Sequence, residues 1–225
     1  MTIKNFQFQE SLNQNSSKKV IIFLNAGGWG NTPIEKADDL APILKGIEKT
    51  LSRLGHEIEI IDYKRVEDGF FEKIKAIGES FDNNFKKSKK LSKIIEKILV
   101  NNSQTKIIMV GLSNGALFVD ETIKKIPKEI QKHVYAIEVG PPFWQKNADS
   151  ENVLRLNNKN KDSLTKGETK KLLLAALKAP LVWFLGKISG TKISFPKSFR
   201  APGHQYPWES PEVGDKIVSF LEKKI

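Results

Sequence analysis

Short, continuous apolar runs recur along the chain, and they constrain its fold more than any other feature. Residues 20–25 (VIIFLN), 106–110 (KIIMV) and 134–139 (VYAIEV) are apolar at most positions, and a glycine follows each run within two residues. Runs without polar alternation are typical of strands buried on both faces, as in parallel sheets. Between them, residues 35–54 and 90–99 show the apolar spacing of helices. This alternation predicts a three-layer α/β sandwich with a mostly parallel sheet.

The rest of the chain completes this pattern as one domain, residues 1–225, because it contains no internal repeat, long linker or low-complexity block. We expect Pro180 to divide the helical segment at residues 168–188 into two pieces. The apolar, lysine-bearing insert at residues 166–190 is expected to pack on the sheet, to cap a site or to lie at a membrane surface. The further expected elements are strands at residues 57–63, 152–156 and 192–195 and helices at residues 114–126 and 211–225.

Composition excludes several classes of protein. The chain has no Cys and only three His, so we expect no disulfide, no thiol nucleophile, no metal site and no cofactor. Residues 1–19 lack the apolar core of a secretory signal, and no run of about 18 apolar residues indicates a membrane-spanning helix. We therefore expect a cytoplasmic protein, either free in solution or bound peripherally to a membrane.

One five-residue motif carries the predicted chemistry. The apolar run at residues 106–110 continues directly into residues 111–115 (GLSNG), and a helical segment follows. This is the G-x-S-x-G pattern between a buried strand and a helix, where it forms a sharp turn that exposes the Ser. A side chain in place of either glycine would clash, because the strand and the helix approach closely. The pattern predicts Ser113 as a nucleophile, with a purely structural turn as the alternative.

By this motif and by the order of its elements, the chain from residue 19 to residue 225 resembles the α/β-hydrolase superfamily of serine hydrolases. That family orders its catalytic residues as Ser, then Asp or Glu, then His. The resemblance implies a minimal α/β-hydrolase core with Ser113 as nucleophile, Asp162 as acid and His204 as base. Asp149 is the competing acid, and Asp162 has the alternative role of capping a helix N-terminus.

The resemblance also implies a mechanism. His204 would take the hydroxyl proton of the nucleophile, and Asp162 would fix the imidazole tautomer and stabilise the imidazolium. Attack on an acyl carbon creates an oxyanion, which needs preorganised N–H donors. We expect the backbone N–H of Asn114 to be one donor, and that of Gly28 or Trp29 to be the other. The expected activity is cleavage of a carboxylic ester or thioester through an acyl-enzyme.

Apolar residues near the motif are candidates for a substrate pocket. Leu112 precedes the nucleophile, Phe143 and Trp144 follow the strand at residues 134–139, and Tyr206 follows the candidate base. These residues predict a site for a small acyl ester or a lipid-like substrate. The alternative is that they pack locally beneath loops, since aromatic residues usually serve cores.

Positive charge is concentrated in one stretch. The formal net charge is +11, and residues 155–200 hold eleven Lys or Arg against two acids, a net of +9. Such a stretch is either a solvated surface or a contact for an anionic membrane. A catalytically silent binding protein that uses this region is therefore the second hypothesis. No nucleic-acid motif accompanies the charge, so we expect no nucleic-acid partner, and the sequence does not indicate an oligomeric state.

Overall fold

A computed structural model of the chain describes residues 19–27, 37–63, 80–145, 150–189 and 201–225. Five strands form one sheet in which every neighbouring pair is parallel, in the order β2-β1-β3-β4-β5. The strands are β1 (Lys19–Asn25), β2 (Glu57–Asp62), β3 (Lys106–Leu112), β4 (Val134–Val139) and β5 (Val153–Leu156). The helices are α2 (Ala41–Arg53), α4 (Ser80–Asn101), α5 (Asn114–Ile123), α6 (Lys128–Gln131), α7 (Ser163–Lys166), α8 (Thr169–Ile188) and α10 (Gly214–Lys224), with a short 3-10 helix at Asn158–Asn160.

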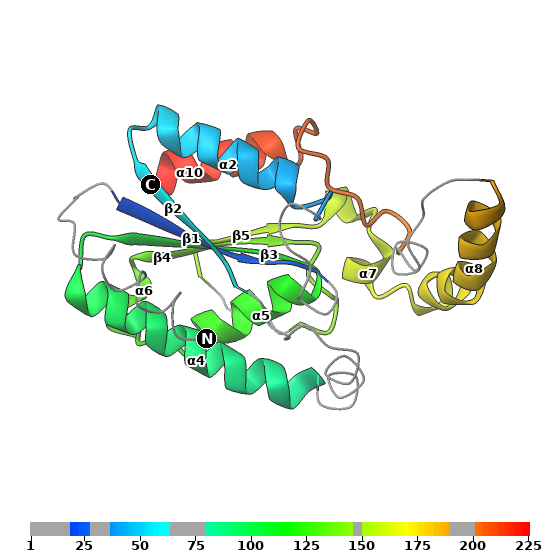
Figure 1. Cartoon of the computed structure of the whole chain (residues 1–225), viewed down its shortest axis with the longest axis horizontal. Helices are drawn as coiled ribbons and strands as arrows, with labels where there is room; N and C mark the ends of the chain where they lie inside the picture. The colour runs from blue at the N-terminus through cyan, green and yellow to red at the C-terminus, as the bar shows by residue number, and fades with distance from the viewer. Residues whose placement is uncertain (1–18, 28–36, 64–79, 146–149, 190–200) are drawn as a thin grey trace.

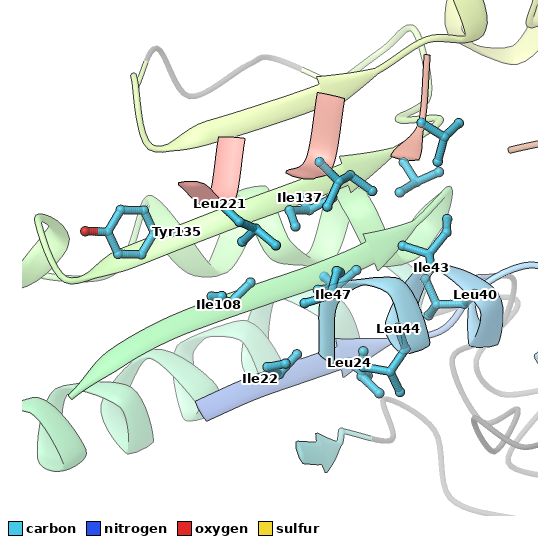
Figure 2. Close-up of a cluster of buried hydrophobic side chains, with 14 of the residues drawn as sticks. Ile22, Leu24, Leu40, Ile43, Leu44, Ile47, Ile108, Tyr135, Ile137 and Leu221 are labelled. Atoms are coloured by element: carbon cyan, nitrogen blue, oxygen red, sulfur yellow. The ribbon is translucent and has the colours of Figure 1, made fainter. Parts of the chain in front are cut away.

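Helices cover both faces of the sheet, which confirms the predicted three-layer α/β class. Helices α2 and α10 lie on one face, and α4 and α5 lie on the other (Figure 1). Successive side chains of β1 alternate between the two cores: Ile22 and Leu24 join the core beneath α2 and α10, whereas Ile21 and Phe23 join the core over α4 and α5. Figure 2 shows the first core, in which Ile22 and Leu24 lie near α2 and Leu221 reaches in from α10. A buried aliphatic side chain of this size contributes about 2 kcal/mol.

The strand order fixes where a ligand site belongs. In the order 2-1-3-4-5, β2 lies on one side of β1, whereas β3, β4 and β5 follow one another on its other side. The direction in which the chain adds strands therefore reverses between β1 and β3. Doubly wound sheets bind ligands outside the carboxyl ends of the strands at this reversal. Strand β3 ends at Leu112, so the turn that holds Ser113 lies at the reversal.

Two predicted elements differ in the structure. Helix α8 runs without interruption from Thr169 to Ile188 with Pro180 inside it, so the predicted division into two pieces is wrong. A proline removes one donor and bends a helix, but the Leu and Ala residues on its N-terminal side favour helix strongly enough for the helix to continue. Helix α4 is longer than the periodic segment at residues 90–99. The strand expected at residues 192–195 lies outside the described residues.

Within the described ranges, no helix has the length and apolar character needed to cross a membrane.

A buried ionic cluster lies beneath the carboxyl end of β4. Glu138, which is fully buried, accepts hydrogen bonds at Oε2 from Arg155 Nε at 2.9 Å and from Gln145 Nε2 at 3.0 Å. The guanidinium of Arg155 also lies 3.7 Å from Oδ1 of Asp120, a second fully buried carboxylate. Burial raises the pKa of Glu138 to about 7, assisted by Asp120 and opposed by Arg155.

This raised pKa predicts a pH-dependent stability. The folded protein holds the Glu138 proton more tightly than the unfolded chain, so this stabilisation is complete below about pH 4.5 and is lost as the pH rises to about 7. Between pH 5 and pH 8, Glu138→Gln should gain about 3 kcal/mol in unfolding free energy relative to the wild type. Urea unfolding across this range measures the difference. The control is Glu129→Gln, on an exposed part of α6. If the unfolding free energies of wild type and Glu138→Gln change with pH in parallel, the raised pKa of Glu138 is contradicted.

Candidate active site

Ser113 occupies a strained backbone corner between β3 and α5. Its φ is 54° and its ψ is −117°, a region that non-glycine residues seldom adopt and that persists only when surrounding structure enforces it. The enforcing contacts are short: Ser113 N–H donates to the carbonyl of Val139 at 2.8 Å, and the Ser113 carbonyl accepts from Ala116 N–H at 2.8 Å. The backbone of Ser113 is therefore hydrogen-bonded both to the end of β4 and to the first turn of α5.

The two glycines of the motif are required by space. A Cβ on Gly111 would lie 2.4 Å from the carbonyl oxygen of Gly115, and a Cβ on Gly115 would lie 2.1 Å from that of Asn25. Both distances are far below van der Waals contact, and in both cases the obstacle is backbone. Strand β3, helix α5 and strand β1 thus approach too closely for any side chain at these positions, which confirms the steric reason predicted for the motif.

Asp162 and His204 form a close, nearly buried pair. His204 Nδ1 lies 2.6 Å from Asp162 Oδ2. The Asp162 side chain is fully buried, and that of His204 is 13% exposed. The same carboxylate oxygen accepts a hydrogen bond from Tyr206 Oη at 2.6 Å, and Oδ1 accepts from Leu164 N–H at 2.8 Å. Asp162 therefore both pairs with the imidazole and caps α7, so the capping role is confirmed and the catalytic role stays a prediction.

The surroundings of Asp162 keep it ionised. Burial raises the pKa of this carboxyl, but hydrogen bonds from His204, Tyr206 and Leu164 lower it by more. The pKa of Asp162 therefore lies below its usual value. Burial and the neighbouring carboxylate raise the pKa of Tyr206 far above its usual value, so Tyr206 stays protonated as a donor. An ionised Asp162 can only accept, so the proton belongs on His204 Nδ1 and leaves Nε2 as an acceptor.

The loop that carries His204 fits closely against the Asp162 loop. Gly203 has a φ of 77°, and a Cβ there would lie 2.2 Å from the carbonyl oxygen of Lys161. Ser163 N–H donates to the Pro202 carbonyl at 2.9 Å, so backbone hydrogen bonding also joins the two loops. Glycine beside the His therefore permits a close approach of this loop to the Asp162 loop.

The His204 imidazole also lies at the end of β4, the strand end to which Ser113 is hydrogen-bonded. A Cβ on Gly140, whose φ is 57°, would lie 2.5 Å from His204 Cε1. Gly140 immediately follows Val139, the residue whose carbonyl accepts from Ser113 N–H. Ser113 and His204 thus both lie at the carboxyl end of β4, one beside its last residue and the other over the next.

The remaining predicted site residues have varied surroundings. Asn114 is the first residue of α5, so its N–H lies in the first helical turn, and Leu112 is half-buried at the end of β3. Phe143 and Trp144 are each about half exposed and pack edge to face, with ring centroids 5.0 Å apart. Gly28, Trp29 and Asp149 lie outside the described residues.

Tyr206 differs from its prediction as a pocket-lining residue. It is buried in the core beneath α2 and α10, and its hydroxyl is engaged by Asp162. Sequence reasoning missed this role, although one signal exists: His204 and Tyr206 are two residues apart, the spacing at which side chains of an extended segment point the same way. Their rings meet edge to face with centroids 5.6 Å apart.

The chain matches no model of a known protein family, and no curated protein matches it. Across the described ranges, no group of three or more His, Asp or Glu is placed to hold a metal ion. An ionised carboxylate orients an imidazole whose other ring nitrogen can accept a proton. A serine held at a sharp corner lies at the same strand end.

Loss of the Tyr206 hydroxyl should weaken this arrangement measurably. Tyr206→Phe removes one of three hydrogen bonds to a buried, ionised carboxylate and should lower the unfolding free energy by about 2 kcal/mol. Urea unfolding at neutral pH measures the loss. The control is Tyr135→Phe in the same core, because no hydrogen bond from the Tyr135 hydroxyl is seen among the described residues. Equal losses in the two variants would contradict a specific role for the Tyr206–Asp162 bond.

Proposed function

We propose that this protein is a serine hydrolase of the α/β-hydrolase type that cleaves a carboxylic ester or thioester. One observation carries the proposal: the His204–Asp162 pair, joined at 2.6 Å, lies over Gly140 at the same strand end to which Ser113 is bonded. A strand, a strained serine corner and a helix, with an acid and a His arriving later in the chain, are the parts that such enzymes require.

The first half-reaction forms an acyl-enzyme. His204 Nε2 takes the proton of Ser113 Oγ as that oxygen bonds to the acyl carbon, and Asp162 stabilises the resulting imidazolium. The backbone N–H of Asn114 donates to the oxyanion, with Gly28 or Trp29 as the second donor. The bond to the alcohol or thiol then breaks, and His204 delivers its proton to that leaving group.

The second half-reaction reverses these roles with water. His204 accepts a proton from water as the water oxygen bonds to the acyl carbon, and the proton then returns to Ser113 Oγ as its bond to carbon breaks. The products are a carboxylic acid and the original enzyme. No external oxidant, reductant or metal enters this balance.

The residues around the pair favour an apolar acyl group. Phe143 packs against Gly167, where a Cβ would lie 2.8 Å from the Phe143 ring, so the half-exposed pair of Phe143 and Trp144 lies beside the turn that ends α7. Helix α8 begins two residues after Gly167 and carries further exposed apolar side chains. A small acyl ester or a lipid-like ester is therefore the proposed substrate class, and the segment at residues 166–190 is the candidate cap.

Active-site labelling tests this proposal. A fluorophosphonate probe should label the wild-type chain covalently and should fail to label Ser113→Ala, because an unactivated serine hydroxyl attacks phosphorus too slowly. The matched control is Ser52→Ala, at an exposed position of α2, which should label like the wild type. A folded wild-type protein that stays unlabelled would favour the second hypothesis, a silent binding protein.

The labelling rate also separates the two candidate acids. Asp162→Asn should slow labelling on the order of 10⁴-fold, because an amide favours the wrong imidazole tautomer, whereas Asp149→Asn should react at nearly the wild-type rate. The opposite result would assign the acid to Asp149.

A further inference from the structure

Helix α8 exposes an unusually apolar surface. Seven of its large apolar side chains are between 53% and 69% exposed, and Ala179 is the one described side chain of this helix that is buried. Figure 1 shows α8 projecting from the body of the protein beyond α7, away from the helices that cover the sheet. The exposed residues are Leu173, Leu174, Leu177, Leu181, Phe184, Leu185 and Ile188.

These side chains form one continuous stripe. Leu173, Leu177, Leu181, Phe184 and Ile188 are separated by four, four, three and four positions, which is the spacing of one helix face. At 100° per residue, the seven side chains span about 120° of the helix circumference, and the buried Ala179 lies on the opposite side. The stripe therefore faces away from the contact that α8 makes with the rest of the chain.

Lysines accompany the stripe, and acids do not. Lys170, Lys171 and Lys178 are exposed, and the sequence of α8, TKKLLLAALKAPLVWFLGKI, contains no Asp or Glu. The acid immediately before the helix, Glu168, forms an ion pair with Lys171 at 3.0 Å. This face thus combines apolar side chains with a net positive charge, within the stretch that carries a net charge of +9.

We propose that this face of α8 docks flat on an anionic lipid bilayer. Leucine and phenylalanine side chains would enter the boundary between headgroups and acyl chains, and the lysines would contact lipid phosphates. Charge complementarity selects this occupant over a second copy of the chain. A copy would bring the same lysines together and repel, whereas an anionic bilayer supplies both the apolar layer and the opposite charge.

Docking in this way would place the candidate active site next to the bilayer. Asp162 caps α7, and α8 follows α7 after a short turn at Gly167. The docking proposal does not depend on catalysis, because lipid binding is measured without turnover. Ser113→Ala should bind vesicles as the wild type does, so failure of one proposal leaves the other intact.

Vesicle flotation with the full chain tests the proposal. The protein should float with vesicles that contain about one third phosphatidylglycerol and stay behind with pure phosphatidylcholine, and binding should weaken between about 0.05 M and about 0.5 M salt. Leu177→Ser with Leu181→Ser keeps the charge and should abolish binding. These side chains are exposed, so the double variant should keep the wild-type unfolding transition.

Two triple variants distinguish an effect of the α8 lysines from an effect of the protein's net charge. Replacing Lys170, Lys171 and Lys178 with Gln should lower the partition coefficient about a hundredfold. The control replaces Lys89, Lys90 and Lys93, exposed lysines of α4, with Gln and removes the same charge, so it should bind like the wild type.

Three results would overturn the proposal. The first is a wild-type protein that binds neither kind of vesicle. The second is an equal loss of binding in the α4 and α8 triple variants. The third is a concentration-dependent dimer, in sedimentation analysis, that Leu177→Ser with Leu181→Ser dissolves, because that result would assign the face to a second copy.

Discussion

The buried carboxylate of Asp162 organises the candidate site. Its two oxygens accept from Leu164 in the first turn of α7 and from His204 and Tyr206 in the loop before α10. A buried charge is costly unless donors surround it, so removal of any one donor leaves part of that cost uncompensated. The hydrogen bonds to this carboxylate therefore hold the start of α7 and the loop before α10 together, and one of them orients the imidazole of His204.

The sheet supplies the second half of the arrangement. Parallel strands bring their carboxyl ends to one edge, and Ser113 N–H reaches across that edge to the end of β4. Gly140 leaves room for the His204 ring at the same place. The strained backbone of Ser113 has the same consequence, because a sharp turn between strand and helix exposes the serine side chain above the strand ends. Backbone hydrogen bonds hold the serine at this strand end, Gly140 leaves room for the imidazole there, and the Asp162 side chain orients the imidazole.

Local sequence patterns predicted those parts of the structure that local physics controls. Apolar runs predicted the parallel strands, and the glycine spacing around Ser113 predicted the corner, because close approach excludes larger residues there. The family resemblance implied that Asp162 and His204, 42 positions apart, belong together, and their side chains lie 2.6 Å apart; the alternative acid, Asp149, lies outside the described residues. The Tyr206 hydroxyl bond spans 44 positions, and the raised pKa of Glu138 depends on Arg155 and Asp120 from other elements. Sequence reasoning missed both because the partners are distant in the chain; the two-residue spacing of His204 and Tyr206 was the one signal for the first, and no local pattern indicated the second. It also overestimated the effect of Pro180 within α8.

In the proposed enzyme, the imidazole that Asp162 orients takes the proton of Ser113 Oγ. A crystal structure of the chain after reaction with a small alkyl phosphonate tests it most directly. Phosphorus should be bonded to Ser113 Oγ, with His204 Nε2 within about 3 Å of the serine or leaving-group oxygen and Nδ1 still hydrogen-bonded to Asp162. Phosphorus on another residue, or an imidazole turned away from the adduct, would contradict it.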